Sequence, residues 1–249
     1  MHPRVQQYLD VRRRGRGALV PLEGAWALER ARSCGATIEA VFVCDGSRAV
    51  DLDIRCEVVV VGARVMRRLV DRDAPGEVCA LARRPMVRSL DELGLGPSSM
   101  IVVADGLDLP GNLGTIVRCA DGAGASAVVL CDSPVRVAHP TVVKASTGAV
   151  LRLPVLDVGR GEAIAWLRAA GVRVVAADPS ATTSYRDADY GGGAAVAIVL
   201  GSERRGLAPG WRAAADELVS IPMLGVADSL NVGHAAALLL YEALHRQRT

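Results

Sequence analysis

Aromatic residues are scarce in this chain of 249 residues, at only 3% of the sequence. Alanine, valine and leucine must therefore supply most of the packing. Because hydrophobic residues make up 51% of the chain, they are numerous enough to fill a core. This composition excludes a disordered chain. The length fits one large domain or two small ones.

The six cysteines lack the spacing of a metal site. None of them forms a CxxC pair, and no cysteine–histidine cluster has the spacing of zinc ligands. Most lie in apolar runs, such as residues 41–44 and 128–131, which favours buried, reduced thiols in a cytosolic protein. We therefore expect no metal cofactor.

Targeting and membrane segments are also lacking. Residues 1–4 do not have the apolar core of a signal peptide. No apolar stretch approaches the roughly 18 residues of a membrane span. We therefore expect a soluble, cytoplasmic protein with no membrane partner.

A polar stretch separates two segments of different character. Residues 1–90 are typical of a small α/β unit, and residues 98–249 form a second unit. In the first unit, helical spacing occurs at 22–34 and 65–70, β-branched apolar runs at 38–43 and 58–61 predict strands, and 77–81 is a further short strand. The linker between the two units contains Gly94, Gly96 and Pro97.

The second unit alternates strands with helices. We expect strands at 100–104, 127–131, 172–176, 195–200 and 218–221, and helices at 112–123, 141–150, 162–170 and 229–245. This alternation predicts an α/β fold with a mainly parallel sheet covered on both faces. The last helix is apolar nearly all round, so we expect it to be buried within the domain or across a subunit interface.

Three short motifs in the second unit could carry chemistry. The first places Asn112 and Arg118 at the start of a helix that follows a strand. The second is the Gly-Ser-Glu run at 201–203, directly after another strand. The third joins residues 220–225 to Ser-Leu-Asn at 229–231, before the last helix. Helix N-termini and the carboxyl ends of parallel strands both bind ligands, but each motif alone is also explained by an ordinary cap or turn.

Nucleotide-binding fingerprints are missing. The chain has neither the GK[ST] element of a phosphate-binding loop nor the GxGxxG run of a dinucleotide site. A Rossmann-type dehydrogenase is therefore a weaker alternative, despite the α/β pattern.

Together, the order and spacing of the three motifs resemble the SpoU/TrmH family of SPOUT-class RNA 2′-O-ribose methyltransferases. The patterns are N-x-G-x-x-x-R, G-S-E-x-x-G and I-P-M-x-G-x-x-x-S-L-N-V, and the resemblance covers residues 100–249. It implies a C-terminal SPOUT domain with a deep trefoil knot and S-adenosylmethionine as the cofactor. It also implies a homodimer whose active site forms near the subunit interface.

The resemblance also assigns site residues. The catalytic positions of the family fall on Asn112, Arg118, Glu203, Ser229 and Asn231. The cofactor positions fall on Leu200, Gly201, Ile221, Met223 and Leu230. Two positions depart from the family pattern, because many relatives have glycine in place of Arg204 and serine in place of Gly233.

The chemistry of methyl transfer suits these residue types. A sulfonium methyl group is already electrophilic, so the reaction needs no metal. The ribose hydroxyl is a weak nucleophile, so its proton must be taken or stabilised and the reacting atoms held in line. We expect Arg118 to stabilise negative charge at the 2′-oxygen or a phosphate. Ser229 and Asn231 would orient the ribose, and Glu203 would hold Arg118 or a backbone amide.

The first unit resembles, more loosely, the substrate-binding domain of rRNA-directed members. The net charge is only +2, so RNA binding has to come from local patches. Arg12, Arg13, Arg14 and Arg16 would contact phosphates, although a solvated basic turn also explains them. We therefore expect 23S rRNA as the substrate. The alternatives are a tRNA methyltransferase, an antibiotic self-resistance 23S rRNA methyltransferase, a base methyltransferase and a non-catalytic ribosome-assembly protein.

Overall fold

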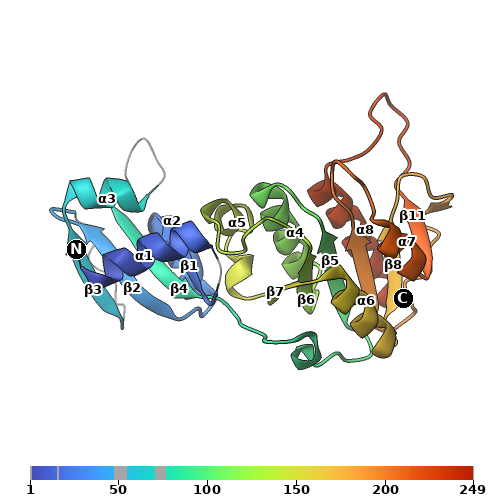
Figure 1. Cartoon of the computed structure of the whole chain (residues 1–249), viewed down its shortest axis with the longest axis horizontal. Helices are drawn as coiled ribbons and strands as arrows, with labels where there is room; N and C mark the ends of the chain where they lie inside the picture. Colours follow the sequence, from blue (N-terminus) through green and yellow to red (C-terminus); the bar gives the residue numbers. More distant parts are fainter. Residues whose placement is uncertain (1, 16, 48–54, 71–76, 249) are drawn as a thin grey trace. The chain divides into compact units, whose positions relative to one another are not determined.

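The computed structural model describes residues 2–15, 17–47, 55–70 and 77–248 (Figure 1). The chain divides into two compact units. The first comprises Met1–Pro85 together with Arg136–Arg152, and the second comprises Met86–Val135 together with Leu153–Thr249. A segment from the middle of the sequence therefore packs with the N-terminal unit.

The first unit is built on a four-stranded mixed sheet with the order β1-β4-β2-β3. Strands β2 and β3 are parallel, and the other neighbours are antiparallel. The strands are β1 (Leu19–Glu23), β2 (Ile38–Cys44), β3 (Glu57–Val61) and β4 (Val78–Arg83). The helices are α1 (Pro3–Arg14), α2 (Ala25–Ser33), α3 (Ala63–Leu69), α5 (Pro140–Ala145) and the 3-10 turn η2 (Ala149–Leu151).

An apolar core joins α1 and α3 to this sheet. Tyr8 of α1 and Phe42 of β2 meet edge to face, with 5.3 Å between the ring centroids. Met66 and Leu69 of α3 are fully buried in the same cluster. Helix α2 packs against β1 and β4. A small core of this kind suits a binding module, since few aromatic residues are needed to hold the sheet and helices together.

Two elements of the first unit differ from the sequence prediction. Helix α1 is not predicted because only Val5 and Tyr8 along it are buried, which leaves no clear apolar period. The helix predicted at 22–34 is wrong at its start, since its first two residues belong to strand β1. Gly24, with a φ of 87°, separates β1 from α2 because it can adopt a backbone conformation that side chains disfavour.

The second unit is built on a seven-stranded sheet with the order β7-β6-β5-β10-β8-β11-β9, in which every pairing is parallel. The strands are β5 (Met100–Asp105), β6 (Ala127–Cys131), β7 (Val155–Val158), β8 (Arg173–Ala177), β9 (Thr183–Ser184), β10 (Val196–Leu200) and β11 (Glu217–Ser220). The helices are η1 (Leu90–Leu93), α4 (Pro110–Gly122), α6 (Arg160–Ala169), α7 (Pro209–Ala214) and α8 (Val232–Arg248). Strands β5, β6 and β10 are buried along their whole length, which confirms the predicted parallel α/β fold.

The strand order changes direction at β5. The chain runs from β5 to β6 and β7 on one side, and β8 and β11 lie on the other side, beyond β10. In open α/β sheets, ligands bind outside the carboxyl ends of the strands at such a point. All seven strands are parallel, so their carboxyl ends share one edge, and the sheet itself points to this edge as the place for a site.

Three helix boundaries differ from the predicted ones. Helix α4 begins at Pro110, so Asn112 lies inside the first turn instead of capping the helix. Helix α8 begins at Val232, and Asn231 caps it in place of Ser229, because Asn231 Oδ1 accepts a hydrogen bond from the Gly233 N–H at 2.9 Å. The helix predicted at 141–150 splits into α5 and η2. No helix in the described ranges is long and apolar enough to span a membrane.

Candidate active site

A hydrogen-bond network joins the three sequence motifs. Asn112 of α4 donates from Nδ2 to Glu203 Oε1, and its Oδ1 accepts from Asn231 Nδ2 at 3.1 Å. Asn112 is only 8% exposed, so both ends of its amide are satisfied where water has little access. The partners lie 91 and 119 residues away in sequence. The network therefore holds three distant segments in one arrangement.

The turn after β10 positions Glu203. Ser202 and Gly206 bond to each other in both directions, with N···O distances of 3.1 and 2.8 Å. A Cβ atom on Gly201 would lie 2.5 Å from the Gly206 carbonyl and 2.6 Å from the Leu207 nitrogen. These neighbours are backbone atoms that cannot swing aside, so the turn closes only because residue 201 has no side chain.

Helix α4 and helix α8 approach each other closely beside this network. A Cβ atom on Gly233 would lie 2.7 Å from Thr115 Cγ2 and 3.1 Å from Asn231 Oδ1. A serine at position 233 of this chain would place its Cβ atom equally close to Thr115. Cys119 of α4 lies 4.0 Å from the Gly233 carbonyl at this contact. Burial raises the pKa of the Cys119 thiol, and the charge of the neighbouring Arg118 lowers it by a smaller amount.

Arg118 lies on the exposed side of α4. No hydrogen bond or ion pair joins Arg118 to another described residue. Glu203 was expected to hold Arg118 or a backbone amide, but it accepts a hydrogen bond from Asn112. An exposed guanidinium keeps its five N–H donors available for a phosphate or a developing oxyanion. The charge that the sequence predicts for the site is therefore present and accessible.

The third motif lines a pocket at the carboxyl ends of β8 and β11. Three predicted cofactor residues, Ile221, Met223 and Leu230, line it together with the predicted catalytic Ser229. The remaining lining residues are Ala177, Asp178, Pro179, Val219, Asp228 and Ala235. The pocket has a volume of about 70 Å³, and apolar side chains lie in it beside the polar groups of an irregular loop.

The other two predicted cofactor residues, Leu200 and Gly201, do not line this pocket. Leu200 is 1% exposed at the end of β10. Gly201 follows it in the turn that carries Glu203. Their contribution in the described structure is to shape that turn.

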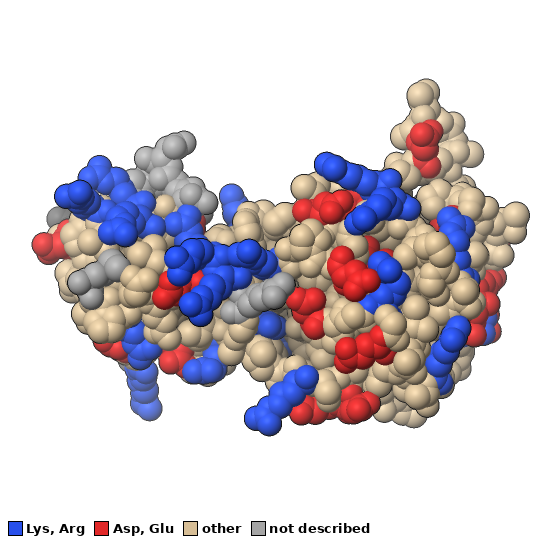
Figure 2. Space-filling view, in the orientation of Figure 1, with Lys and Arg blue, Asp and Glu red and all other residues tan. Residues whose placement is uncertain are grey.

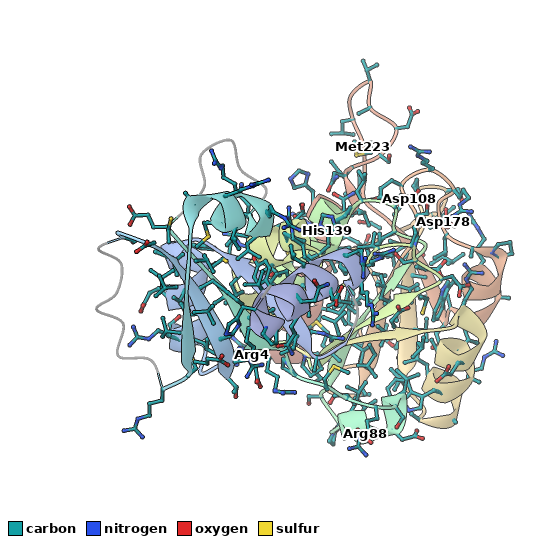
Figure 3. All side chains as sticks on the ribbon, turned by 60° about the vertical axis from the view of Figure 1, so that its left-hand side comes forward. Arg4, Arg88, Asp108, His139, Asp178 and Met223 are labelled. Carbon is teal, nitrogen blue, oxygen red and sulfur yellow. The ribbon has the colours of Figure 1, made fainter. Side chains whose placement is uncertain are left out.

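Sequence reasoning missed Asp178, which lies in the wall of the pocket. Its carboxylate is 1% exposed, pairs with Arg212, and accepts hydrogen bonds from the backbone N–H of Ser180 at 2.9 Å and from Ser180 Oγ at 2.7 Å. Figure 3 shows Asp178 and Met223 on the loops at this end of the second unit. The signal available in the sequence was an acidic residue two positions after the strand predicted at 172–176.

A second buried carboxylate stabilises the same edge of the sheet. Arg160, the first residue of α6, donates to Asp105 Oδ1 at 3.0 Å and pairs with Asp132 at 3.2 Å. The hydrogen bond to Asp105 raises the pKa of Arg160. These groups satisfy one another, so they join α6 to the ends of β5 and β6 and are not arranged for a reaction. The described residues contain no cluster of histidine, cysteine or carboxylate groups that could hold a metal ion.

The predicted RNA-binding arginines lie at the end of α1 in the first unit. Arg13 pairs with Asp10 at 2.7 Å, and Arg12 donates to the carbonyl of Arg68 at 3.1 Å, which places the end of α1 beside α3. Arg14 is exposed, and Arg16 lies outside the described residues. Figure 2 shows basic side chains gathered over this part of the unit.

Known proteins resemble this chain over most of its length. Residues 99–241 match the SpoU rRNA Methylase family, a span that contains all ten predicted catalytic and cofactor residues. The chain is 30% identical over 253 residues to the 23S rRNA (adenosine(1067)-2′-O)-methyltransferase of Streptomyces laurentii, with 98% of this chain and 93% of the relative covered.

Streptomyces viridochromogenes provides both a further match in sequence and one in structure. The chain is 34% identical over 200 residues to its 23S rRNA (uridine(2479)-2′-O)-methyltransferase, with 78% of this chain and 69% of the relative covered. The crystal structure of the SpoU methyltransferase AviRb in complex with the cofactor AdoMet superimposes with a TM-score of 0.87 at 28% identity, over 100% of this chain and 99% of the other. The predicted SpoU/TrmH identity is confirmed: the chain belongs to the SpoU rRNA Methylase family.

Proposed function

We propose that this chain transfers the methyl group of S-adenosylmethionine to a ribose 2′-hydroxyl of 23S rRNA. The main support is the network of Asn112, Glu203 and Asn231, which joins the three motifs beside the pocket of Ile221 and Met223. Relatives that align with most of the chain are named for this reaction, and a solved relative binds AdoMet.

The chemistry of the residues assigns some to cofactor binding and others to positioning the ribose. S-adenosylmethionine, when bound, supplies an electrophilic methyl group. Ile221, Met223 and Leu230 would hold it through their apolar surfaces and the backbone groups between them. Asn112 and Glu203 fix the start of α4 against the turn after β10. This fixed frame sets where an incoming ribose can lie.

The polar groups outside that frame would act on the ribose. Ser229 is exposed at the pocket, and its hydroxyl can both donate and accept hydrogen bonds to a ribose oxygen. Arg118 would stabilise the charge that develops on the 2′-oxygen as the methyl group is transferred. An arginine base would need a strongly lowered pKa, which the guanidinium resists, so we assign Arg118 an electrostatic role.

The first unit would bind the RNA substrate. Helix α1 ends in three consecutive arginines, and α3, which lies beside it, adds Arg64, Arg67 and Arg68. Because Arg13 is paired with Asp10, we expect Arg14 and the arginines of α3 to contribute more to phosphate binding. Replacing Arg14 with alanine should reduce the salt dependence of RNA binding by roughly one phosphate contact.

We also propose that two copies of the chain form a homodimer. The loop before α8 carries Leu224 and Val226 fully exposed, and Leu238 and Tyr241 of α8 are exposed as well. Large apolar side chains on a surface mark contact with a partner. Sedimentation analysis of the wild type and of Leu238→Glu should give a dimer and a monomer, respectively. A monomeric wild type would contradict the proposal.

The reaction is tested with tritiated S-adenosylmethionine and two substrates, 23S rRNA lacking the modification and bulk tRNA. We expect label in 23S rRNA that digestion recovers as a 2′-O-methylnucleoside. The variant Asn112→Leu serves as the inactive control, because it loses both hydrogen bonds of the network. Label only in tRNA would overturn the substrate proposal, and label on a base would overturn the assignment of the acceptor atom.

A further inference from the structure

A cavity in the first unit has no part in the site described above. Its volume is about 530 Å³, which lies within the range of small-ligand pockets. It is lined from β1, α2 and α5 by Pro21, Glu23, Trp26, Ala27, His139, Pro140, Thr141, Val143 and Lys144. All nine residues belong to the first compact unit.

The cavity is lined by an aromatic ring that is half exposed. Most aromatic side chains of this chain are buried, as Tyr8, Phe42 and Trp211 are, but Trp26 is 54% exposed. About half of the Trp26 surface is therefore open to a ligand. Exposed aromatic rings are the surfaces on which unstacked bases of single-stranded RNA pack. Trp26 therefore provides a stacking surface at the cavity.

Hydrogen-bonding groups of both kinds surround this ring. His139 Nδ1 accepts from the Thr141 N–H at 3.1 Å, so a neutral imidazole carries its proton on Nε2, which can donate to a ligand. Figure 3 shows His139 where α5 begins. Glu23, which also pairs with Arg12 at 3.8 Å, lines the cavity with a carboxylate that accepts hydrogen bonds when it is ionised.

A single positive charge completes the lining. Lys144 is the only lysine in the sequence and is exposed. A lysine ammonium binds phosphate as a point charge. These groups match the parts of one nucleotide. The aromatic surface, the donor and the acceptor match a base with an amino group, and the cation matches its phosphate.

We propose that this cavity binds one unstacked nucleobase of the RNA substrate, stacked on Trp26, with the adjoining phosphate on Lys144. The base bound here is a different one from the nucleotide that is methylated, because the cavity contains none of the predicted catalytic residues. The proposal rests on the proposed function of the chain as an RNA methyltransferase. It adds a second recognition point that would select single-stranded RNA over a duplex.

The test measures binding of the full-length protein to a 12-nucleotide single-stranded RNA of mixed sequence and to the corresponding duplex. Trp26→Ala should weaken single-strand binding roughly tenfold, and Trp26→Phe, which keeps a ring, should weaken it much less. Lys144→Met should lower the salt slope by about 0.7. Val60→Ala, at an exposed apolar residue of β3, is the matched control and should bind like the wild type.

Two readouts separate this proposal from the proposed function. Unchanged single-strand affinity in Trp26→Ala would overturn the base-binding cavity, even if the variant methylates 23S rRNA normally. A tenfold loss in a protein that labels no 23S rRNA would support the cavity and overturn the function. Loss of binding to adenosine monophosphate in Trp26→Ala, with wild-type affinity for RNA, would assign the cavity to a free nucleotide and also overturn the proposal. Thermal unfolding of each variant checks that the fold is intact.

Discussion

The two halves of the candidate site differ in how firmly the protein holds them. In the first half, hydrogen bonds join Asn112 to Glu203 and Asn231. The backbone packs so closely around Gly201 that a side chain there would not fit. In the second half, the exposed Arg118 and the exposed residues 224–230 have open surroundings. The first half is therefore a frame that contacts within the chain hold in place, and the second half is open to solvent.

The largest loss of stability is expected at Gly201, where the surrounding backbone leaves no space for a side chain. Gly201→Ala would place a Cβ atom 2.5 Å from the Gly206 backbone, so we expect a loss of about 3 kcal/mol in the free energy of unfolding and loss of cofactor binding. Chemical denaturation and calorimetric titration with S-adenosylmethionine measure both effects. The control is Gly225→Ala, since a Cβ atom at Gly225 meets no described atom within 4 Å. Equal stability of the two variants would contradict the close contact.

The next effect should fall on turnover and leave the fold unchanged. Arg118→Ala removes an exposed charge, so we expect turnover to fall by roughly 100-fold or more, with unchanged cofactor affinity and a change in stability within about 0.5 kcal/mol. Single-turnover kinetics measure the chemical step directly. Arg248→Ala, at the end of α8, controls for the loss of one exposed arginine. Normal turnover in Arg118→Ala would remove this residue from the catalytic assignment.

A moderate effect is expected at the contact between α4 and α8. Gly233→Ala should lower the free energy of unfolding by about 1–2 kcal/mol, because the new Cβ atom would lie 2.7 Å from Thr115 Cγ2. Thr115→Ser removes that methyl group, so the double variant should recover part of the loss. A double-mutant cycle measured by denaturation gives the coupling. A coupling below about 0.5 kcal/mol would show that the two helices relax apart.

The smallest effect separates the two roles of Asn231. Asn231→Ala loses both the helix cap and the bond to Asn112, and we expect a loss of about 1 kcal/mol in stability. Asn231→Asp keeps an acceptor for the Gly233 N–H but cannot donate to Asn112 when ionised. We expect the aspartate variant to be nearly as stable as the wild type, yet impaired in methyl transfer. If both variants were equally active, the network would serve stability alone.

Much of the second unit was predictable from local sequence. Buried parallel strands are continuous apolar runs, so the strand predicted at 127–131 coincides with β6, and those at 100–104 and 195–200 differ from β5 and β10 by one residue. The short elements β7, β9 and α7 were missed because they have too few residues to show a period. Helix α1 was missed because it buries only two side chains.

The sequence predicted which residues belong to the candidate site, but it did not predict the contacts between them. Motif spacing selected Asn112, Glu203 and Asn231, and the structure brings them together. The partner of Glu203, the cap at Asn231 and the place of Asp178 in the pocket depend on contacts between distant segments, which no local pattern contains. The trefoil knot implied by the resemblance stays a prediction.

The family, the parallel α/β architecture and the residues available for chemistry were predictable without a structure, because they follow from short motifs and apolar periodicity. Contacts between distant segments decided that Arg136–Arg152 packs with the first unit, where Lys144 comes to share a cavity with Trp26. They also decided that a side chain at position 233 would press against Thr115. The physical reason is the same in each case: these properties arise from close packing between residues about 120 positions apart in the chain.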